Sequence, residues 1–260
     1  MVKASMGLAV AFGVLAVLVA AAFPVLIHRA ETAAGDAAQA RRRAMRAALA
    51  TAAWMAATFA AAASGRLSFT TVPPTMAVVI ALSLALALRI GLSGTGARLA
   101  AGVPLALLVG VQGFRLPLEL LMHRAYSEGV MPVQMSYSGR NFDIVTGATA
   151  IVLAAALWLA PQRVSPKVVL LWNLLGSALL LNVLTVAILS APGPLRVFMN
   201  EPSNVWITQA PFVWLPAVLV VAALASHVVI FRRLRMEARG RAGASSTKRA
   251  AASRTPAVVA

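Results

Sequence analysis

The side chains best suited to bind a ligand begin with a polar stripe near the middle of the chain. Arg115, Glu119 and His123 are spaced four residues apart, and Gln112 precedes them by three. Residues three or four apart share one face of an α-helix, so this spacing predicts a single polar stripe. Arg115 is expected to pair with Glu119, and Glu119 to accept a hydrogen bond from His123. A guanidinium could hold an anionic group, and a carboxylate beside an imidazole could set local protonation.

A second polar group follows after a loop rich in turn-forming residues. Asn141 and Asp143 are placed where the next helix begins, and a carboxylate there suits the positive end of the helix dipole. Arg140 precedes them, and Glu201 belongs to a later loop that we expect on the same side. The candidate ligand-binding site therefore comprises eight residues: Gln112, Arg115, Glu119, His123, Arg140, Asn141, Asp143 and Glu201.

The composition places these charges in a membrane protein. The 260 residues are 60% apolar and only 12% charged, whereas a soluble domain carries about 25% charged residues. Apolar runs of about 20 residues, long enough to cross a bilayer, recur along the chain. We therefore predict an all-α polytopic bundle of about seven transmembrane helices. Residues 1–231 would form this domain, and residues 232–260 a basic, disordered cytoplasmic tail.

The expected spans follow the apolar runs: Met6–Ile27, Ala47–Ala63, Thr75–Leu88, a fourth from Leu99 into the polar stripe, a fifth from Asp143 to Ala160, Val168–Leu189 and Pro211–Phe231. The alanine-rich second span is expected in the middle of the bundle, as small-residue faces are in membranes. A tight turn is expected over Arg89–Arg98, and a kink at Pro117. The first span exceeds the roughly 7–15 apolar residues of a secretory signal. We read it as a membrane span, with a cleaved signal as the alternative.

The basic residues orient the bundle. If the tail is cytoplasmic, 17 Lys and Arg residues fall inside and 5 outside, with Arg115 within a helix. Cytoplasmic loops are enriched in Lys and Arg, so we predict the N-terminus outside, the C-terminus inside, and the candidate site open to the outer side. The expected location is a bacterial cytoplasmic (inner) membrane. The net charge of +16 is explained by these loops and the tail, and no nucleic-acid partner is expected.

Four more specific functions do not fit the residues. The last span lacks the lysine that a retinal protein needs. The chain also has no cysteine, which excludes disulfides, thiolate metal sites and cysteine nucleophiles. Membrane haem needs paired histidines, whereas the three histidines are scattered. A Cu(I) site and a rhomboid-protease motif have weak matches. The residues for copper are His123, Met122, Met131, Met135 and Met199, and those for the protease are Gly91–Gly94. Methionine more often fills packing gaps, and Gly and Ser are common in turns. We predict no metal and no cofactor.

Two segments around the polar stripe carry a resemblance. Arg115-x-Pro117-x-Glu119, followed by Gly139-Arg140-Asn141-Phe142-Asp143, resembles a pattern in uncharacterised bacterial multi-pass membrane proteins. The resemblance covers residues 112–150 and implies no known activity.

The leading hypothesis is that the protein binds or passes a small polar or ionic ligand at an outward-facing site. Arg115 would hold an anionic group, while Glu119 and His123 would set protonation. The alternatives are an enzyme that uses Glu119 with His123, a scaffold subunit of a membrane complex, and a purely structural ion pair. The expected partners are the bilayer, a small polar ligand, and a membrane protein or a second copy of the chain.

Overall fold

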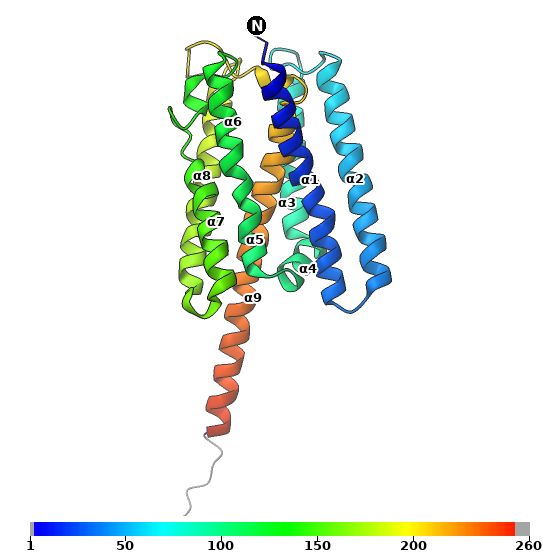
Figure 1. The fold of residues 1–260 in the computed structure, drawn as a ribbon, viewed down its shortest axis with the longest axis vertical. Coiled ribbons are helices and arrows are strands. Elements are labelled where there is room, and N and C mark those ends of the chain that lie inside the picture. Colours follow the sequence, from blue (N-terminus) through cyan, green and yellow to red (C-terminus); the bar gives the residue numbers. More distant parts are fainter. Residues whose placement is uncertain (1–2, 253–260) are drawn as a thin grey trace, which may run out of the picture.

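The structure, a computed structural model, describes residues 3–252. Regular secondary structure in this range is helical throughout. The α-helices are α1 (Met6–Ala33), α2 (Ala37–Ala63), α3 (Thr75–Leu92), α4 (Gly94–Gly102), α5 (Leu105–Val111), α6 (Arg115–Ser127), α7 (Ile144–Leu159), α8 (Pro166–Ser190) and α9 (Val220–Ala252). The long helices run up and down beside one another (Figure 1). We call the end where α1 begins, and where α6 and α8 finish, the amino-terminal end of the bundle.

Six helices of the described chain are long and apolar enough to cross a membrane. They are α1, α2, α3, the continuous run Leu105–Ser127, α8 and the helix from Leu215 to Ala242. The 16-residue α7 is also apolar but shorter. The prediction of an all-helical membrane bundle is thus confirmed in its main feature. The count of seven spans, the orientation of the termini and the bacterial inner membrane stay predictions.

Side chains at the helix starts explain several boundaries. The hydroxyl of Ser5 accepts a hydrogen bond from the backbone N–H of Leu8, and Asp36 accepts one from Gln39. Pro166 occupies the first position of α8, where its missing N–H costs nothing. Local capping of this kind fixes where a helix begins before any tertiary contact is made.

The turn expected over Arg89–Arg98 is shorter than the sequence suggested. Helix α3 continues to Leu92, and α4 then occupies residues 94–102 as a separate short helix. The hydroxyl of Ser93 accepts from the N–H of Thr95 and so starts α4. Pro104 ends this segment because proline cannot continue the helix, and α5 begins directly after it.

The irregularity expected at Pro117 occurs slightly earlier. A 3₁₀ turn over Gln112–Phe114 joins α5 to α6. Pro117 falls in the first turn of α6, where a missing donor is tolerated. The tighter turn rotates the side chains that follow it, and the first of these is Arg115.

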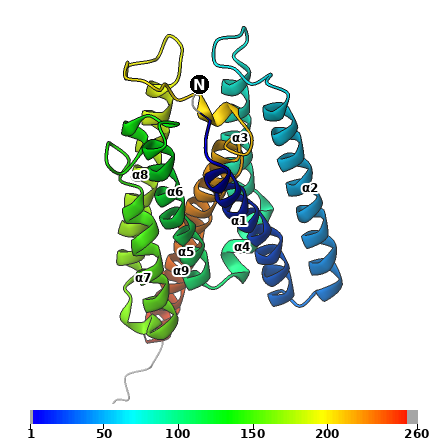
Figure 2. The ribbon, with the colours of Figure 1, turned by 45° about the horizontal axis from the view of Figure 1, so that its top comes forward.

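Helix α2 is not in the middle of the bundle, so that prediction was wrong. It packs along α1 at the edge (Figures 1 and 2), and only 11% of its most apolar stretch is buried. Alanine offers little area to bury, so packing gains little from a central position. Two indoles attach α2 to the last span. Trp54 donates to the Ala217 carbonyl at 2.8 Å, and Trp214 donates to the Met55 carbonyl at 3.1 Å.

The last span begins with a π-helical turn. Residues Leu215–Leu219 form this turn, and α9 continues from it. Pro216 lies within the turn and removes one backbone donor. The Ala217 carbonyl that accepts from Trp54 belongs to the same turn. Short π segments inside helices are frequent at functional sites.

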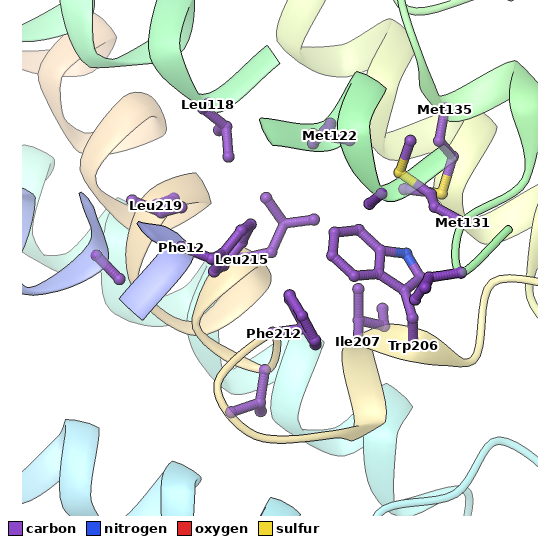
Figure 3. Packing of buried hydrophobic residues seen from close by; sticks show 14 of the residues in the cluster. Phe12, Leu118, Met122, Met131, Met135, Trp206, Ile207, Phe212, Leu215 and Leu219 are labelled. Carbon is purple, nitrogen blue, oxygen red and sulfur yellow. The ribbon is translucent and has the colours of Figure 1, made fainter. Parts of the chain in front are cut away.

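The main apolar core contains residues from the start of α1, from α6 and from the segment before α9, and so lies toward the amino-terminal end of the bundle. Figure 3 shows how its side chains pack. The ring of Trp206 packs there against Phe212 and Phe12, with centroids 4.9 Å and 5.9 Å apart. The Trp206 side chain is 1% exposed, so it belongs to the core and not to a surface that could face the membrane interface. Of the methionines considered for copper, Met122, Met131 and Met135 belong to this core, and Met199 is 71% exposed. The packing of Met122, Met131 and Met135 agrees with a gap-filling role.

The segment from Arg232 onward differs from the disordered tail that we expected. Helix α9 continues without a break through Ala252 and extends beyond the other helices at the opposite end of the bundle (Figure 1). Arg232 donates to the carbonyls of Gly91 and Ser93, both at 2.7 Å, and Arg233 donates to Ala100 at 3.0 Å. These bonds to the α3–α4 corner order the start of the segment. Residues 253–260 lie outside the described range.

Candidate functional site

Arg115 is a deeply buried charged side chain of the candidate site, with 1% exposure. Its Nε donates to Oδ2 of Asp143 at 2.6 Å, and its Nη2 lies 2.5 Å from the same oxygen. The expected pairing of Arg115 with Glu119, four residues away, is therefore replaced by a pairing across 28 residues. Asp143 directly precedes α7 but caps no backbone N–H, because its carboxylate faces the guanidinium instead.

Close backbone packing between α6 and α7 makes this pairing possible. A Cβ added to Gly147 would lie 2.8 Å from the carbonyl carbon of Arg115. Only glycine permits such an approach, which brings the start of α7 against the start of α6. The cross-helix ion pair thus depends on a residue that carries no polar group itself.

The other end of the guanidinium meets a histidine from the last helix. Nη1 of Arg115 lies 2.8 Å from Nε2 of His227, and Nδ1 of His227 lies 2.8 Å from Oδ1 of Asn173. A guanidinium only donates, so Nε2 is the acceptor and the ring proton is assigned to Nδ1. His227 is therefore a neutral imidazole that donates to Asn173. The amide nitrogen of Asn173 in turn donates to the His227 carbonyl at 3.1 Å.

His227 and Asn173 were not among the residues expected at the site, although the sequence carried a signal for them. Both are polar residues within apolar spans, and such residues are expected to find partners inside the bundle. Their spans were recognised, but nothing in the sequence indicated that α8 and α9 face Arg115. Gly176 makes room for the ring, because a Cβ there would lie 2.7 Å from Cε1 of His227.

Glu119 is also 1% exposed, but it has a different kind of partner. The amide nitrogen of Asn141 donates to both of its carboxylate oxygens, at 2.9 Å and 2.8 Å, and to the Met135 carbonyl at 3.0 Å. Oδ1 of Asn141 accepts from the N–H of Asp143 at 3.0 Å, which fixes the amide orientation. Glu119 forms no ion pair within the described chain.

Gln112, the third buried residue of the stripe, joins the 3₁₀ turn after α5 to α9. Its amide nitrogen donates to the Ala223 carbonyl at 3.0 Å. The stripe residues Gln112, Arg115 and Glu119 thus bond to α9 and to the segment 141–143, and not to one another. This division explains why the expected contacts within the stripe do not form.

Three of the eight predicted site residues lie apart from this group. His123 bonds through Nδ1 to the hydroxyl of Ser136 at 2.9 Å and stacks on Tyr137, with centroids 4.4 Å apart. The guanidinium carbon of Arg140 lies 5.3 Å from the ring centroid of Phe198.

Glu201, the last of the three, is an exposed residue of the loop after α8. It accepts from Arg196 at 2.8 Å, and this hydrogen bond holds the pKa of the Glu201 carboxyl below its usual range. These three residues were included because they are near the stripe in sequence or on the side expected for it. The site is therefore smaller than expected, and its centre lies deeper in the bundle.

A cavity of about 440 Å³ opens beside the buried charges. Most of its lining residues come from α3, α6 and α8, from the loop 191–195 after α8 and from the Leu215–Val220 segment. Arg115, Glu119 and Asp143 line it, together with one other polar residue, Asn204. The remaining lining side chains are apolar. Six that are also labelled in Figure 3 are Leu118, Met122, Met135, Ile207, Leu215 and Leu219.

Exposed residues border the cavity on the side of the bundle, between α3 and α8. Its lining residues Ala77 and Ala81 are exposed on α3, and Ile188 is 42% exposed on α8. Glu119 lies eight residues before the end of α6, which corresponds to about 12 Å along a helix. The polar groups are therefore at the inner end of an apolar cleft between two helices. No group of three or more His, Asp or Glu residues in the described chain could hold a metal ion.

Comparison with known proteins gives one match. The sequence pattern of a family described as "Domain of unknown function (DUF8737)" matches residues 72–235, which is 164 of the 260 residues. This match contains the whole candidate site and is wider than the resemblance seen over residues 112–150. No curated protein and no solved structure matches the chain.

Proposed function

The chain belongs to this family of unknown function, and we propose that it binds an amphipathic, membrane-borne ligand in the cavity between α3 and α8. The apolar part of the ligand would lie between the two helices, and its polar end would meet Glu119. One observation carries the proposal: an apolar cavity, bordered by exposed residues on the side of a membrane bundle, ends at buried ionisable groups.

The size of the cavity supports a ligand rather than a packing defect. Ligand pockets typically measure about 300–1,000 Å³ and are mostly apolar, with a few polar groups that fix orientation. The cavity of about 440 Å³ falls in this range, and four of its thirty lining residues are polar. An acyl or isoprenoid chain would pack against such walls, and it has no polar groups that would lose their hydration on entry. Entry from the bilayer would need no aqueous path.

The lining also changes the class of ligand proposed from the sequence alone. A small hydrophilic ion would have to leave water for apolar walls, at a cost of several kcal/mol. Arg115 was expected to hold an anion, but its contacts to Asp143 and His227 already engage both sides of the guanidinium. Glu119 has no cationic partner within the described chain and is the better-placed polar contact.

The enzyme hypothesis depended on Glu119 acting with His123. These two side chains bond to different partners, Asn141 and Ser136. Binding therefore requires fewer assumptions than catalysis. We also propose that the amino-terminal end of the bundle faces outward across a bacterial inner membrane, from the distribution of 17 against 5 basic residues. Transport of the bound ligand would be a separate step and is not part of this proposal.

Photolabelling tests the binding site. Wild-type protein in phosphatidylcholine nanodiscs is exposed to a long-chain alcohol that carries a diazirine, and the labelled residues are mapped by mass spectrometry. We expect labels on cavity-lining residues of α3 and α8. Ala187→Trp should fill the cavity wall and reduce these labels. The matched control is Leu181→Trp, on the same helix but 65% exposed and outside the lining.

The control variant decides between cavity binding and ordinary contact with lipid. If the probe labels exposed residues such as Leu181 and Val78 as strongly as cavity residues, and Ala187→Trp has no effect, the proposed site is wrong. If Ala187→Trp removes cavity labels while Leu181→Trp leaves them, the cavity is a binding site.

A further inference from the structure

The charges that line the cavity are unequal in number, and this imbalance indicates the chemistry of the ligand's polar end. Two carboxylates, Glu119 and Asp143, face one guanidinium, Arg115. We propose that the polar end is a cation, an ammonium group held by the Glu119 carboxylate. This inference rests on the proposed function, since it assigns the head group of the same ligand.

Arg115 and Asp143 neutralise each other. Two nitrogens of the guanidinium lie 2.6 Å and 2.5 Å from the same carboxylate oxygen. The side chains of Arg115 and Asp143 are only 1% and 4% exposed, so water screens this pair little. The third guanidinium nitrogen contacts the neutral ring of His227. No net charge is left on this part of the site.

Glu119 forms no ion pair within the described chain, because Arg115 is bonded to Asp143 and His227 instead. The residue exposure of Glu119 is 1%, and its hydrogen bonds come from a single amide nitrogen, that of Asn141. A buried carboxylate without a cationic partner is costly. It must therefore hold a proton or receive a cation from outside the chain. Glu119 lines the cavity, which is large enough to admit a bulky cation.

The acceptor capacity of the carboxylate fits an ammonium group. An ionised carboxylate has about four acceptor positions, and the two hydrogens of one amide nitrogen occupy at most two of them. The Asn141 nitrogen is also shared with the Met135 carbonyl. An ammonium carries three N–H donors and a positive charge, which would fill the remaining positions and balance the second carboxylate.

An anionic head group fits less well. It would approach a group of two carboxylates and one guanidinium, and like charges a few ångströms apart repel strongly where water is excluded. A neutral hydroxyl could accept or donate a hydrogen bond but would leave the charge of Glu119 unbalanced. The order of binding should therefore be ammonium, then hydroxyl, then carboxylate.

Three photoprobes with the same diazirine-bearing chain, ending in an amine, an alcohol or a carboxylate, test this order. The full chain is labelled in phosphatidylcholine nanodiscs, and only labels on cavity residues are counted. We expect the amine to bind about tenfold more tightly than the alcohol, and the carboxylate more weakly than either. Glu119→Gln should remove the amine preference while the alcohol still labels the cavity.

Glu128→Gln is the matched control, because Glu128 lies at the end of α6 and outside the cavity lining. It should leave the amine preference unchanged. If the alcohol labels the cavity but the amine is not preferred in the wild type, the cation is wrong and the proposed function stands. If no probe is confined to the cavity, both are wrong. The wild-type comparison decides the matter even if Glu119→Gln fails to fold.

A final arm separates two sources of the ammonium group. Phosphatidylethanolamine is added to the nanodiscs in increasing amounts. Displacement of the amine probe would assign the site to a phospholipid head group, whereas retention of the probe would assign it to a free long-chain amine. A loss of labelling that phosphatidylglycerol produces equally well would contradict recognition of a cation.

Discussion

Arg115 and His227 are 112 positions apart in the chain and meet inside the bundle, with 2.8 Å between Nη1 and Nε2. Through this contact the guanidinium links the start of α6 to the last helix, and through Asp143 it links both to α7. Asn173 adds α8. Four helices are thus joined by one buried arginine, whose charge is balanced by a residue that is distant in sequence.

This pairing predicts a strongly non-additive response to mutation. Arg115→Met leaves the Asp143 carboxylate buried without a partner and should destabilise the protein by about 3–5 kcal/mol. Arg115→Met combined with Asp143→Leu removes both charges and should recover most of that loss. Thermal unfolding in detergent measures the cycle. Purely additive losses would show that the two side chains do not act as a pair.

The space occupied by His227 depends on a glycine of α8. Gly176→Ala would place a Cβ 2.7 Å from Cε1 of His227 and 2.9 Å from Thr146. Overpacking of this kind typically costs about 1–3 kcal/mol. Gly13→Ala is the control, because its Cβ would meet neighbours only at 3.8 Å or more. We expect a lower unfolding temperature for the first variant alone. Equal temperatures would argue against the tight fit around the imidazole.

Ser5, which directly precedes α1, is attached to the end of α6 through Glu128. The backbone N–H and hydroxyl of Ser5 donate to its carboxylate at 2.8 Å and 2.7 Å, and Arg124 donates at 2.9 Å. The bonds from Ser5, followed by that from Arg124, hold the pKa of Glu128 below its usual range. A lowered folded-state pKa contributes stability above the unfolded pKa of about 4.3, which is lost as the pH falls through the folded value.

Glu128→Gln should therefore remove about 1 kcal/mol at neutral pH and have less effect at low pH. The measurement is the unfolding temperature of both proteins between pH 7 and about 3. The difference between them should shrink toward the acid end. A difference that stays constant across this range would contradict the ionised contact to Ser5.

The orientation of the bundle is tested with single cysteines, since the chain contains none. Ser138 and Gln162 are both exposed, in the loops before and after α7. Ser138→Cys should react with a membrane-impermeant maleimide in intact cells, and Gln162→Cys only after the membrane is opened. The reverse pattern would overturn the orientation inferred from the basic residues.

The sequence predicted the helices well because their length and apolar content are local properties. The starts of α1 and α8 follow a capping residue and a proline that can be read directly. Helix α2 begins at Ala37 after its cap Asp36, ten residues before the expected start at Ala47, because the apolar run alone does not mark the first turns of the helix. The position of α2 could not be read in this way. Small residues permit close packing without requiring it, and α2 lies at the edge, held by Trp54 and Trp214.

The candidate site was predicted in part for a related reason. The spacing of Arg115 and Glu119 correctly placed both on buried positions of one helix. Their partners Asp143, His227 and Asn141 come from other segments, and helix spacing carries no information about these. Residues 232–260 were expected to be disordered from their composition, whereas the structure describes a helix through Ala252. Composition could not show that Arg232 and Arg233 bond to carbonyls of the α3–α4 region.

Native mass spectrometry of protein released from its own membrane tests the central claim, that the α3–α8 cavity holds an amphipathic ligand, most directly. The wild type and Leu181→Trp should both retain an amphiphile of defined mass after the detergent is stripped. Ala187→Trp, which fills the cavity wall, should lose it while remaining folded. Retention of the same mass by Ala187→Trp, or the absence of any bound amphiphile in the wild type, would contradict the account.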